Sequence, residues 1–199
     1  MHPSNGNPGR TPMRRIQSVV VFCGASEGTL PIWRESAVAL GVGLAVRGIR
    51  LVYGGGRSGL MGAVADGALF AGGTVLGVIP DFLRQREVAH TETTFMEITD
   101  TMHARKQRMA DEADAFISFA GGLGTLDETF EIVTWKQLGL HRKPIFICNV
   151  NGSANGLLQA ISAAVAMGFA KPDIYSLYET IEGVPALLHR LETEGAGLP

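Results

Sequence analysis

Two glycine-rich runs in the sequence have the composition of phosphate-binding turns. Residues 54–59 read GGGRSG and residues 121–125 read GGLGT, and each run follows an apolar stretch and precedes a helical pattern. Glycine lets backbone N–H groups approach an anion closely, and the start of a helix adds unpaired N–H groups and a partial positive charge. Neither run is followed by the Lys-Ser or Lys-Thr pair of a P-loop. We therefore expect both turns to hold a phosphate group.

Acidic residues follow the second glycine run. Asp127 and Glu128 stand near the start of the helix that residues 121–125 open. Acids at this place also occur as plain helix stabilisers, because the helix dipole favours them. Glu128 and Glu131 are three residues apart and share one helix face, whereas Asp127 points elsewhere. Among these acids we take Glu128 as the candidate that lies beside a bound phosphosugar.

A basic segment, residues 102–109, reads MHARKQRM. As a helix it places Met102 and Met109 on one core-facing stripe, with Arg105 at the border of that stripe. A basic helix face is most often only solvated. Arg105 stands out because it borders the buried stripe, and because this helix must lie beside the strand that feeds the second turn. Its guanidinium can bind a phosphate or a ribose hydroxyl bidentately.

The elements that must position these residues alternate along the chain from Gln17 onwards. Short β-branched runs indicate strands at 19–22, 49–53, 74–79, 94–98, 115–119 and 144–150, with a further short segment at 175–180. Helical patterns cover 31–47, the stretch from 59 to about 72, 101–113, 121–138, 154–167 and 184–194. This alternation predicts an α/β, Rossmann-like, doubly wound fold, with a mainly parallel sheet and helices on both faces. Since the carboxyl ends of parallel strands share one edge, the turns 24–28, 54–59 and 120–125 should meet there.

The length of the chain suits one such domain. Hydrophobic residues make up 46% of the 199 residues, which is enough for one well-buried core. Residues 1–13 are rich in Pro, Gly and Asn without periodicity, so we expect a disordered leader there. Residues 14–199 are then expected to form a single nucleotide-binding domain.

Charge and composition exclude several classes of function. Formal net charge is -2, from 17 basic and 19 acidic residues, so we expect neither nucleic acid nor an anionic membrane as a partner. No apolar stretch reaches the roughly 18 residues of a spanning helix. Cys23 and Cys148 read as reduced structural thiols, and without a signal peptide the protein is expected in the cytoplasm. The five histidines show no metal-ligand spacing, so no metal site is predicted.

Two other functions stay open from the residues alone. Residues 54–59 match the dinucleotide pattern G-x-G-x-x-G, and Asp81 stands 22 residues after Gly59, where a ribose-binding acid of an NAD-dependent oxidoreductase is sought. Two observations argue against NAD binding. The pattern follows the second predicted strand instead of the first, and another glycine-rich turn follows a later strand. The second alternative is a non-catalytic nucleotide-binding or carrier protein that uses the same glycine-rich edge.

Four motifs in order carry a resemblance to a known family. They are GGGRSGLMG at 54–62, MHARK at 102–106, GGLGTLDE at 121–128 and TWKQLG at 134–139. From about residue 15 to residue 191 the chain resembles the LOG family of cytokinin riboside 5'-monophosphate phosphoribohydrolases, often mislabelled as lysine decarboxylases. The family's second glycine turn begins with Pro, where this chain has Ala120. That change loosens the entry to the turn without removing an N–H donor, so the predicted site is kept and an altered substrate preference is allowed for.

The resemblance implies hydrolysis of the N-glycosidic bond of an N6-substituted AMP, releasing the free base and ribose 5-phosphate. It implies Arg105 and Glu128 as the catalytic pair, no cofactor, and a homodimer in which one subunit's helices complete the other's pocket. The candidate substrate-binding residues, from the glycine turns and from the resemblance, are Ser26, Gly55, Gly56, Gly59, Met61, Glu87, Met102, Lys106, Gly121, Gly122, Leu123, Gly124 and Thr125.

Overall fold

The structure, a computed structural model, describes residues 15–84 and 88–194, so the predicted leader at 1–13 lies outside the described residues. Its sheet has seven strands in the order β4-β3-β2-β1-β5-β6-β7. They are β1 Ser18–Phe22, β2 Arg50–Tyr53, β3 Val75–Pro80, β4 Phe95–Thr99, β5 Ala115–Ser118, β6 Ile145–Asn149 and β7 Glu179–Glu182. Every adjacent pair is parallel. The predicted α/β class is confirmed, and the described sheet is parallel throughout instead of mainly so.

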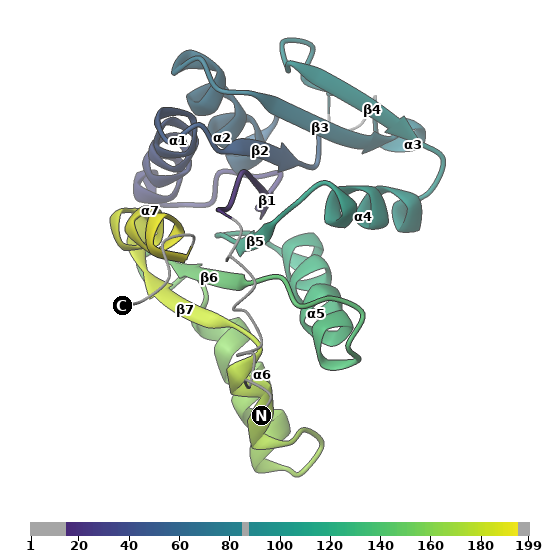
Figure 1. The fold of residues 1–199 in the computed structure, drawn as a ribbon, viewed down its shortest axis with the longest axis vertical. Helices are drawn as coiled ribbons and strands as arrows, with labels where there is room; N and C mark the ends of the chain where they lie inside the picture. Colours follow the sequence, from purple (N-terminus) through teal and green to yellow (C-terminus); the bar gives the residue numbers. More distant parts are fainter. Residues whose placement is uncertain (1–14, 85–87, 195–199) are drawn as a thin grey trace, which may run out of the picture.

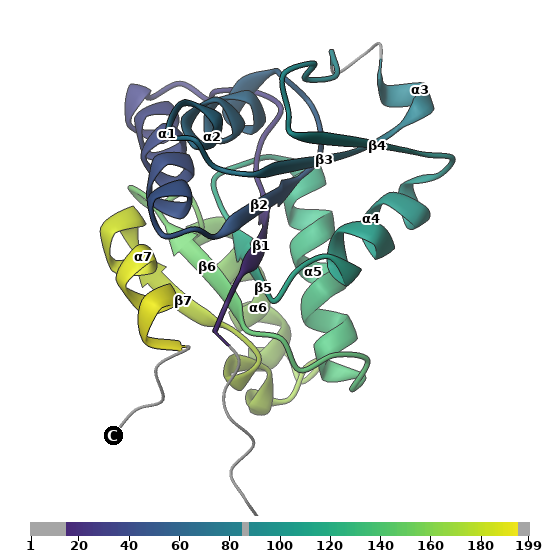
Figure 2. The ribbon, with the colours of Figure 1, turned by 45° about the horizontal axis from the view of Figure 1, so that its top comes forward.

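Helices cover both faces of this sheet (Figures 1 and 2). On one face lie α1 Pro31–Val46, α2 Gly59–Phe70 and α7 Gly183–Glu194, and on the other lie α4 Met102–Asp111, α5 Leu123–Gln137 and α6 Asn155–Ala166. Two short pieces complete the set: α3 Asp81–Arg84, and a 3-10 turn at Pro172–Ser176. The segment expected at 175–180 is thus divided between the end of that turn and the start of β7. None of the described helices has both the length and the apolarity needed to cross a bilayer.

The strands are apolar on both sides because each side packs against helices. In β1, Val19 and Val21 join the core under α1 and α2, while Val20 and Phe22 join the core under α4 and α5. Proline stands at the first position of α1. An N–H group at that position would have no acceptor within the helix, so proline loses no hydrogen bond there. Helices α1 and α2 approach backbone to backbone, because a Cβ on Gly41 would stand 2.1 Å from the Val64 carbonyl oxygen. Glycine therefore permits this close packing.

The order of the strands places the functional edge. From β1 the chain steps outwards through β2 and β3 to β4, and then returns along α4 to β5 on the other side of β1. The gap between β1 and β5 is therefore the topological switch point. In open α/β sheets, ligands bind outside the carboxyl ends of the strands at such a point.

Candidate active site

Gly24, two residues after the end of β1, connects the three turns that the sequence placed at one edge. Its N–H donates to the carbonyl oxygen of Ala120 at 3.0 Å. Its own carbonyl oxygen accepts from the N–H groups of Leu60, at 3.0 Å, and Met61, at 3.2 Å. The turn after β1 therefore lies between the turns after β2 and β5, and backbone hydrogen bonds hold all three together.

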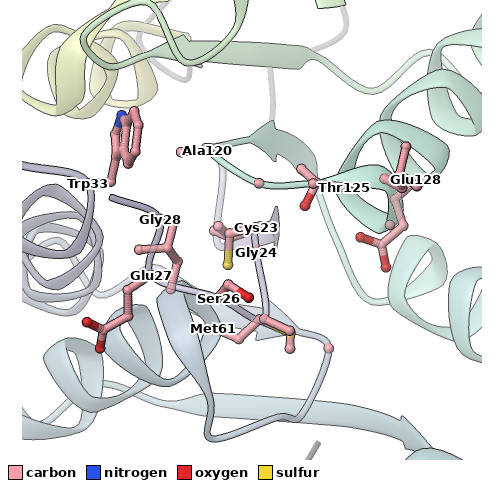
Figure 3. Close-up of a pocket in the computed structure, with 18 of the residues that line it drawn as sticks. Cys23, Gly24, Ser26, Glu27, Gly28, Trp33, Met61, Ala120, Thr125 and Glu128 are labelled. Carbon is pink, nitrogen blue, oxygen red and sulfur yellow. The ribbon is translucent and has the colours of Figure 1, made fainter. Parts of the chain in front are cut away.

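A cavity of about 600 Å³ opens between these turns (Figure 3). The turn after β1, from Cys23 to Gly28, contributes to one wall. The turn after β5 and the start of α5 form another wall, and Glu128 lies at one end of the labelled group while Trp33 lies at the other. Its size falls within the range of small-molecule sites, roughly 300–1,000 Å³.

The start of α5 presents backbone N–H groups to the cavity. Gly122 is the N-cap residue, and it offers no side-chain hydrogen bond to the first N–H groups of the helix. Leu123, Gly124 and Thr125 form the first turn and all line the cavity. N–H groups in that position have no acceptor within the helix, and the helix dipole adds positive potential. A Cβ on Gly122 or Gly124 would meet open space, so a ligand can come close to this backbone.

The start of α2, by contrast, uses its N–H groups within the protein. Two of its first-turn donors, Leu60 and Met61, are satisfied by the carbonyl oxygen of Gly24. Gly59 has φ of +63°, and a Cβ there would stand 2.3 Å from the Ala25 carbonyl carbon. The glycine run 54–59 therefore supports the turn after β1. This arrangement gives no support to the expectation that both glycine turns hold phosphate.

Arg105 lies buried at the carboxyl ends of β2 and β3. Only 5% of the residue is exposed. Its Nε donates to the carbonyl oxygen of Val78 at 3.2 Å, and its Nη2 donates to that of Gly54 at 3.3 Å. Its Nη1 lies 3.8 Å from the sulfur of Met102. These contacts fix one guanidinium beside the cavity, deeper than the border position that the helical pattern indicated.

Glu128 approaches Arg105 from the opposite helix. The Oε1 atom of Glu128 lies 3.8 Å from Nη2 of Arg105, and 8% of the glutamate is exposed. Buried opposite charges of this kind contribute little net stability, so their presence in a cavity favours a functional role. The nearby Cys23 thiol is also buried. Burial, reinforced by the negative charge of Glu128, raises the pKa of Cys23 far above its usual range, so the thiol stays protonated.

Most of the site residues predicted from the sequence line this cavity. They are Ser26, Met61, Arg105, Gly121, Gly122, Leu123, Gly124, Thr125 and Glu128. Five others lie outside the lining: Gly55, Gly56, Gly59, Met102 and Lys106. Of these, Met102 touches Arg105, and Lys106 forms ion pairs with two carboxylates. Glu87 lies outside the described residues.

Two parts of the lining were missing from the sequence-based set. Beyond Ser26, the turn after β1 contributes Cys23 to Gly28, and α1 adds Trp33, whose Nε1 donates to the Val150 carbonyl oxygen at 3.2 Å. Ser153, which follows β6, also lines the cavity. Topology already places turn 24–28 at this edge, although Ser26 is its single candidate residue from the sequence. For Ser153 the sequence carries no comparable signal, since one serine in a turn is common.

One group of potential metal ligands lies outside the cavity. Asp66, His90 and Glu92 bring ligand atoms within 4.8 Å of one another. The imidazole of His90 is already engaged at both nitrogens. Its Nδ1 accepts from the N–H of Glu92 at 3.3 Å, which leaves the proton on Nε2, 2.9 Å from a carboxylate oxygen of Asp66. This group is best explained as an anchor that ties the segment after α3 to α2.

Known proteins share this fold and much of this sequence. A family model described as "Possible lysine decarboxylase" matches residues 61–191. Cytokinin riboside 5'-monophosphate phosphoribohydrolase LOG7 of Arabidopsis thaliana is 44% identical over 178 residues, 89% of this chain and 82% of that protein. LOG1 of the same plant, with the same description, is 40% identical over 178 residues, 89% of this chain and 84% of the relative.

A solved structure supports the fold independently. The molybdenum cofactor carrier protein of Chlamydomonas reinhardtii superposes with a TM-score of 0.69 over 92% of this chain and 100% of that chain, at 21% identity. At this identity the likeness concerns the fold alone. The matched family model covers most of the chain, and the identity to LOG7 and LOG1 over 89% of its length shows that this chain belongs to the LOG family.

Proposed function

We propose that this chain is a phosphoribohydrolase that cleaves the N-glycosidic bond of a cytokinin riboside 5'-monophosphate, an N6-substituted AMP. Water is the second reactant, and the products are the free base and ribose 5-phosphate. One observation carries the proposal. A buried carboxylate and a buried guanidinium, Glu128 and Arg105, stand 3.8 Å apart beside a cavity that also receives the first N–H groups of α5. The LOG relatives carry the same activity in their names.

The phosphate of the substrate binds at the start of α5. The N–H groups of Leu123, Gly124 and Thr125 supply donors, and the dipole of α5 supplies positive potential. The hydroxyl groups of Thr125 and Ser26 line the same cavity and can donate as well. Holding the phosphate here directs the ribose along α5 towards Glu128, which lies three residues after Thr125 on the same helix.

Bond cleavage develops positive charge on the sugar. As the bond between C1' and the base nitrogen breaks, its electron pair leaves with the base, and C1' gains cationic character. The carboxylate of Glu128 stabilises this charge and accepts a proton from the attacking water, whose oxygen forms the new bond to C1'. The proton taken from this water passes on to the base nitrogen, so water supplies OH to C1' and H to the base, Glu128 returns to its carboxylate form, and atoms and charges balance.

Arg105 serves the same step by position and charge. Its contacts with the Val78 and Gly54 carbonyl oxygens hold the guanidinium in place before substrate arrives. From there it orients Glu128 and neutralises negative charge on the phosphosugar or the leaving base. Since these contacts come from the backbone of the sheet, no reorganisation is needed when the reaction begins.

Release of base from a nucleotide tests the function directly. The purified protein is incubated with isopentenyl-AMP, AMP and isopentenyladenosine, and the free base is measured by chromatography. We expect release from the monophosphates and very little from the nucleoside, because the nucleoside lacks the group that α5 binds. Binding of nucleotide without release of any base would instead favour the carrier alternative.

We further propose that the active protein is a homodimer. Apolar side chains on and after α5 are exposed, among them Leu123 at 86%, Leu138 at 68% and Leu140 at 69%. Leu123 also lines the cavity, so a second copy that covers α5 would close the site. Light scattering after gel filtration should give twice the chain mass of 21.1 kDa, and a mass of one chain at assay concentration would contradict this.

A further inference from the structure

Lys106 links two helices that each carry one member of the Arg105 and Glu128 pair. Its ammonium lies 3.1 Å from a carboxylate oxygen of Asp127 and 2.9 Å from one of Glu131. Lys106 belongs to α4, and both acids belong to α5. The Lys106 side chain is 10% exposed and that of Glu131 is 22% exposed, so solvent screens this pair weakly, whereas the Asp127 side chain is 60% exposed. Burial alone would lower the pKa of Lys106, but the hydrogen bonds that its ammonium donates to Glu131 and Asp127 outweigh burial and raise the pKa.

Farther from the cavity, both helices supply apolar residues to the core. Met109 of α4 and Ile132 and Val133 of α5 share one hydrophobic cluster under the sheet. Nearer the cavity, the described backbones of α4 and α5 make little direct contact, although Figures 1 and 2 show the helices as neighbours. Among the described residues at that end, the polar links between the two helices are the Lys106 ion pairs and the 3.8 Å approach of Arg105 to Glu128.

Neighbouring positions on a helix point about 100° apart, which separates the roles of Lys106 and Arg105. Arg105 reaches the carbonyl oxygens at the ends of β2 and β3 and lines the cavity. Lys106 turns to α5 and is absent from the lining. On α5, Glu128 lines the cavity while Asp127 and Glu131 both face α4. The prediction that Glu131 shares a face with Glu128 and that Asp127 points elsewhere was therefore wrong. Lys106, Asp127 and Glu131 therefore form an ion-pair bridge between α4 and α5 that is separate from Arg105 and Glu128.

We propose that Lys106 is a positioning residue, whose ion pairs with Asp127 and Glu131 hold α4 against α5 so that Arg105 and Glu128 keep their reactive spacing. The proposal rests on the proposed function, since it concerns the same pair of residues. It differs from the role implied by family resemblance, in which Lys106 contacts substrate. Misplacement of catalytic groups by about 1 Å can cost on the order of 100-fold in rate, so a bridge of this kind is expected to act on kcat.

Variants on both sides of the bridge test the proposal. Lys106→Met and the double variant Asp127→Asn/Glu131→Gln both remove the ion pairs, whereas Lys106→Arg keeps a cation at the same place. Arg108→Met is the matched control, because Arg108 lies on the same helix and pairs with two acids, Glu97 and Glu112, neither of which belongs to α5. Thermal unfolding of each variant shows whether loss of fold contributes.

We expect Lys106→Met and Asp127→Asn/Glu131→Gln each to lower kcat by about 10-fold to 100-fold with little change in KM. The combined triple variant should be no slower than either, Lys106→Arg should recover most of the rate, and Arg108→Met should stay within about twofold of wild type. A rise in KM confined to the Lys106 variants, with normal kcat in the Asp127→Asn/Glu131→Gln variant, would show a substrate contact and overturn the proposal.

A measurement without turnover keeps this test separate from the proposed function. Spin labels attached to the exposed positions of His103→Cys on α4 and Thr134→Cys on α5 report the distance between the helices. In the Lys106→Met background the distribution of distances should broaden or shift, and in the Arg108→Met background it should not. Unchanged distances in Lys106→Met would refute the bridge even in an active enzyme. Altered distances in a protein that releases no base would retain the bridge and refute only the hydrolase.

Discussion

The two glycine-rich turns look alike in sequence and serve different purposes in the structure. At the start of α2, the N–H groups of Leu60 and Met61 donate to the Gly24 carbonyl oxygen. At the start of α5, the equivalent groups of Gly124 and Thr125 line the cavity. Glycine also has a different role in each turn. Gly59 makes room for the backbone at Ala25, whereas Gly124 borders open space. A glycine motif therefore indicates close approach of backbone, and only its surroundings decide whether protein or ligand approaches.

The comparison extends to the carboxylates on the two helices, which differ in burial and in their partners. Glu128 on α5 is buried beside Arg105, whereas Asp66 on α2 has a side chain that is 48% exposed and pairs with His90. A buried acid beside a cavity can act on a substrate, while a half-exposed acid hydrogen-bonded to a histidine mostly ties segments together. If the two turns had equal roles, both acids would matter to turnover.

Removing the charge of Glu128 should have the largest effect. Glu128→Gln should lower kcat by about 10³-fold while nucleotide affinity stays within a few-fold, because the amide keeps the shape but neither accepts the proton nor stabilises the cationic sugar. Asp66→Asn on α2 is the control and should stay within about twofold of wild-type turnover. Chromatography gives the rates and calorimetry gives the affinities. Equal losses in the two variants would contradict the distinction between the turns.

The next largest difference is expected when an acid is added at the N-cap of each helix, because a carboxylate should weaken binding at the turn that holds the phosphate and not at the other. Gly122→Asp puts a carboxylate where we place the phosphate, and open space at that Cβ lets the variant fold. We expect KM for isopentenyl-AMP to rise roughly 100-fold from like-charge repulsion. Ser58→Asp puts the same charge at the N-cap of α2 and should leave KM unchanged, with equal or slightly higher thermal stability. A higher KM in Ser58→Asp would place phosphate at α2 instead.

Alanine in place of one glycine in each turn should then distinguish structural from binding roles. Gly59→Ala meets the backbone of Ala25 at 2.3 Å and needs a positive φ, so the free energy of unfolding should fall by on the order of 2 kcal/mol. Gly124→Ala meets no neighbour and lies within a helical turn, where alanine is favoured, so stability should hold or improve. Urea unfolding of both variants gives the comparison. Similar losses of stability would mean that both turns are packed alike.

The smallest expected effect is on stability, at the second half of α5, where His141 forms a hydrogen bond with the helix backbone. Its Nε2 donates to the Ile132 carbonyl oxygen at 2.9 Å, and its Nδ1 accepts from the N–H of Lys143 at 3.2 Å, so the ring is neutral. Burial, together with the positive charges of Lys136 and Lys143, lowers the pKa of His141 from its usual 6.5, although the Ile132 hydrogen bond acts in the opposite direction. A lowered pKa means that the folded state resists protonation.

The sign of the pH dependence follows from that shift. The stability due to neutral His141 is fully present above pH 6.5, the ordinary value, and is lost as pH falls through the lower pKa of the folded state. Urea midpoints at about pH 8 and about pH 5 should therefore differ more for wild type than for His141→Gln. An equal pH dependence in the two proteins would remove His141 from this effect.

Much of the fold could be predicted because its signals are local. Buried runs such as Val19 to Phe22, and helix starts such as Pro31, read directly from neighbouring residues, and the alternation of strand and helix implied the parallel sheet. The meeting of three turns at one edge followed from topology. The acceptor of the Leu60 and Met61 donors could not be predicted, because it depends on how β1 and α2 settle against each other. The partners of Lys106 could not be predicted either, because they depend on how closely α4 and α5 pack.

The position of the phosphate is the central claim, and a crystal structure of the Glu128→Gln variant with isopentenyl-AMP would locate it most directly. We predict phosphate oxygens within hydrogen-bonding distance of the Gly124 and Thr125 N–H groups, with C1' of the ribose beside residue 128 and the Arg105 guanidinium. A phosphate bound at the start of α2, against Gly59 and Arg57, with residue 128 remote from the sugar, would contradict both the proposed mechanism and the division of roles between the two turns.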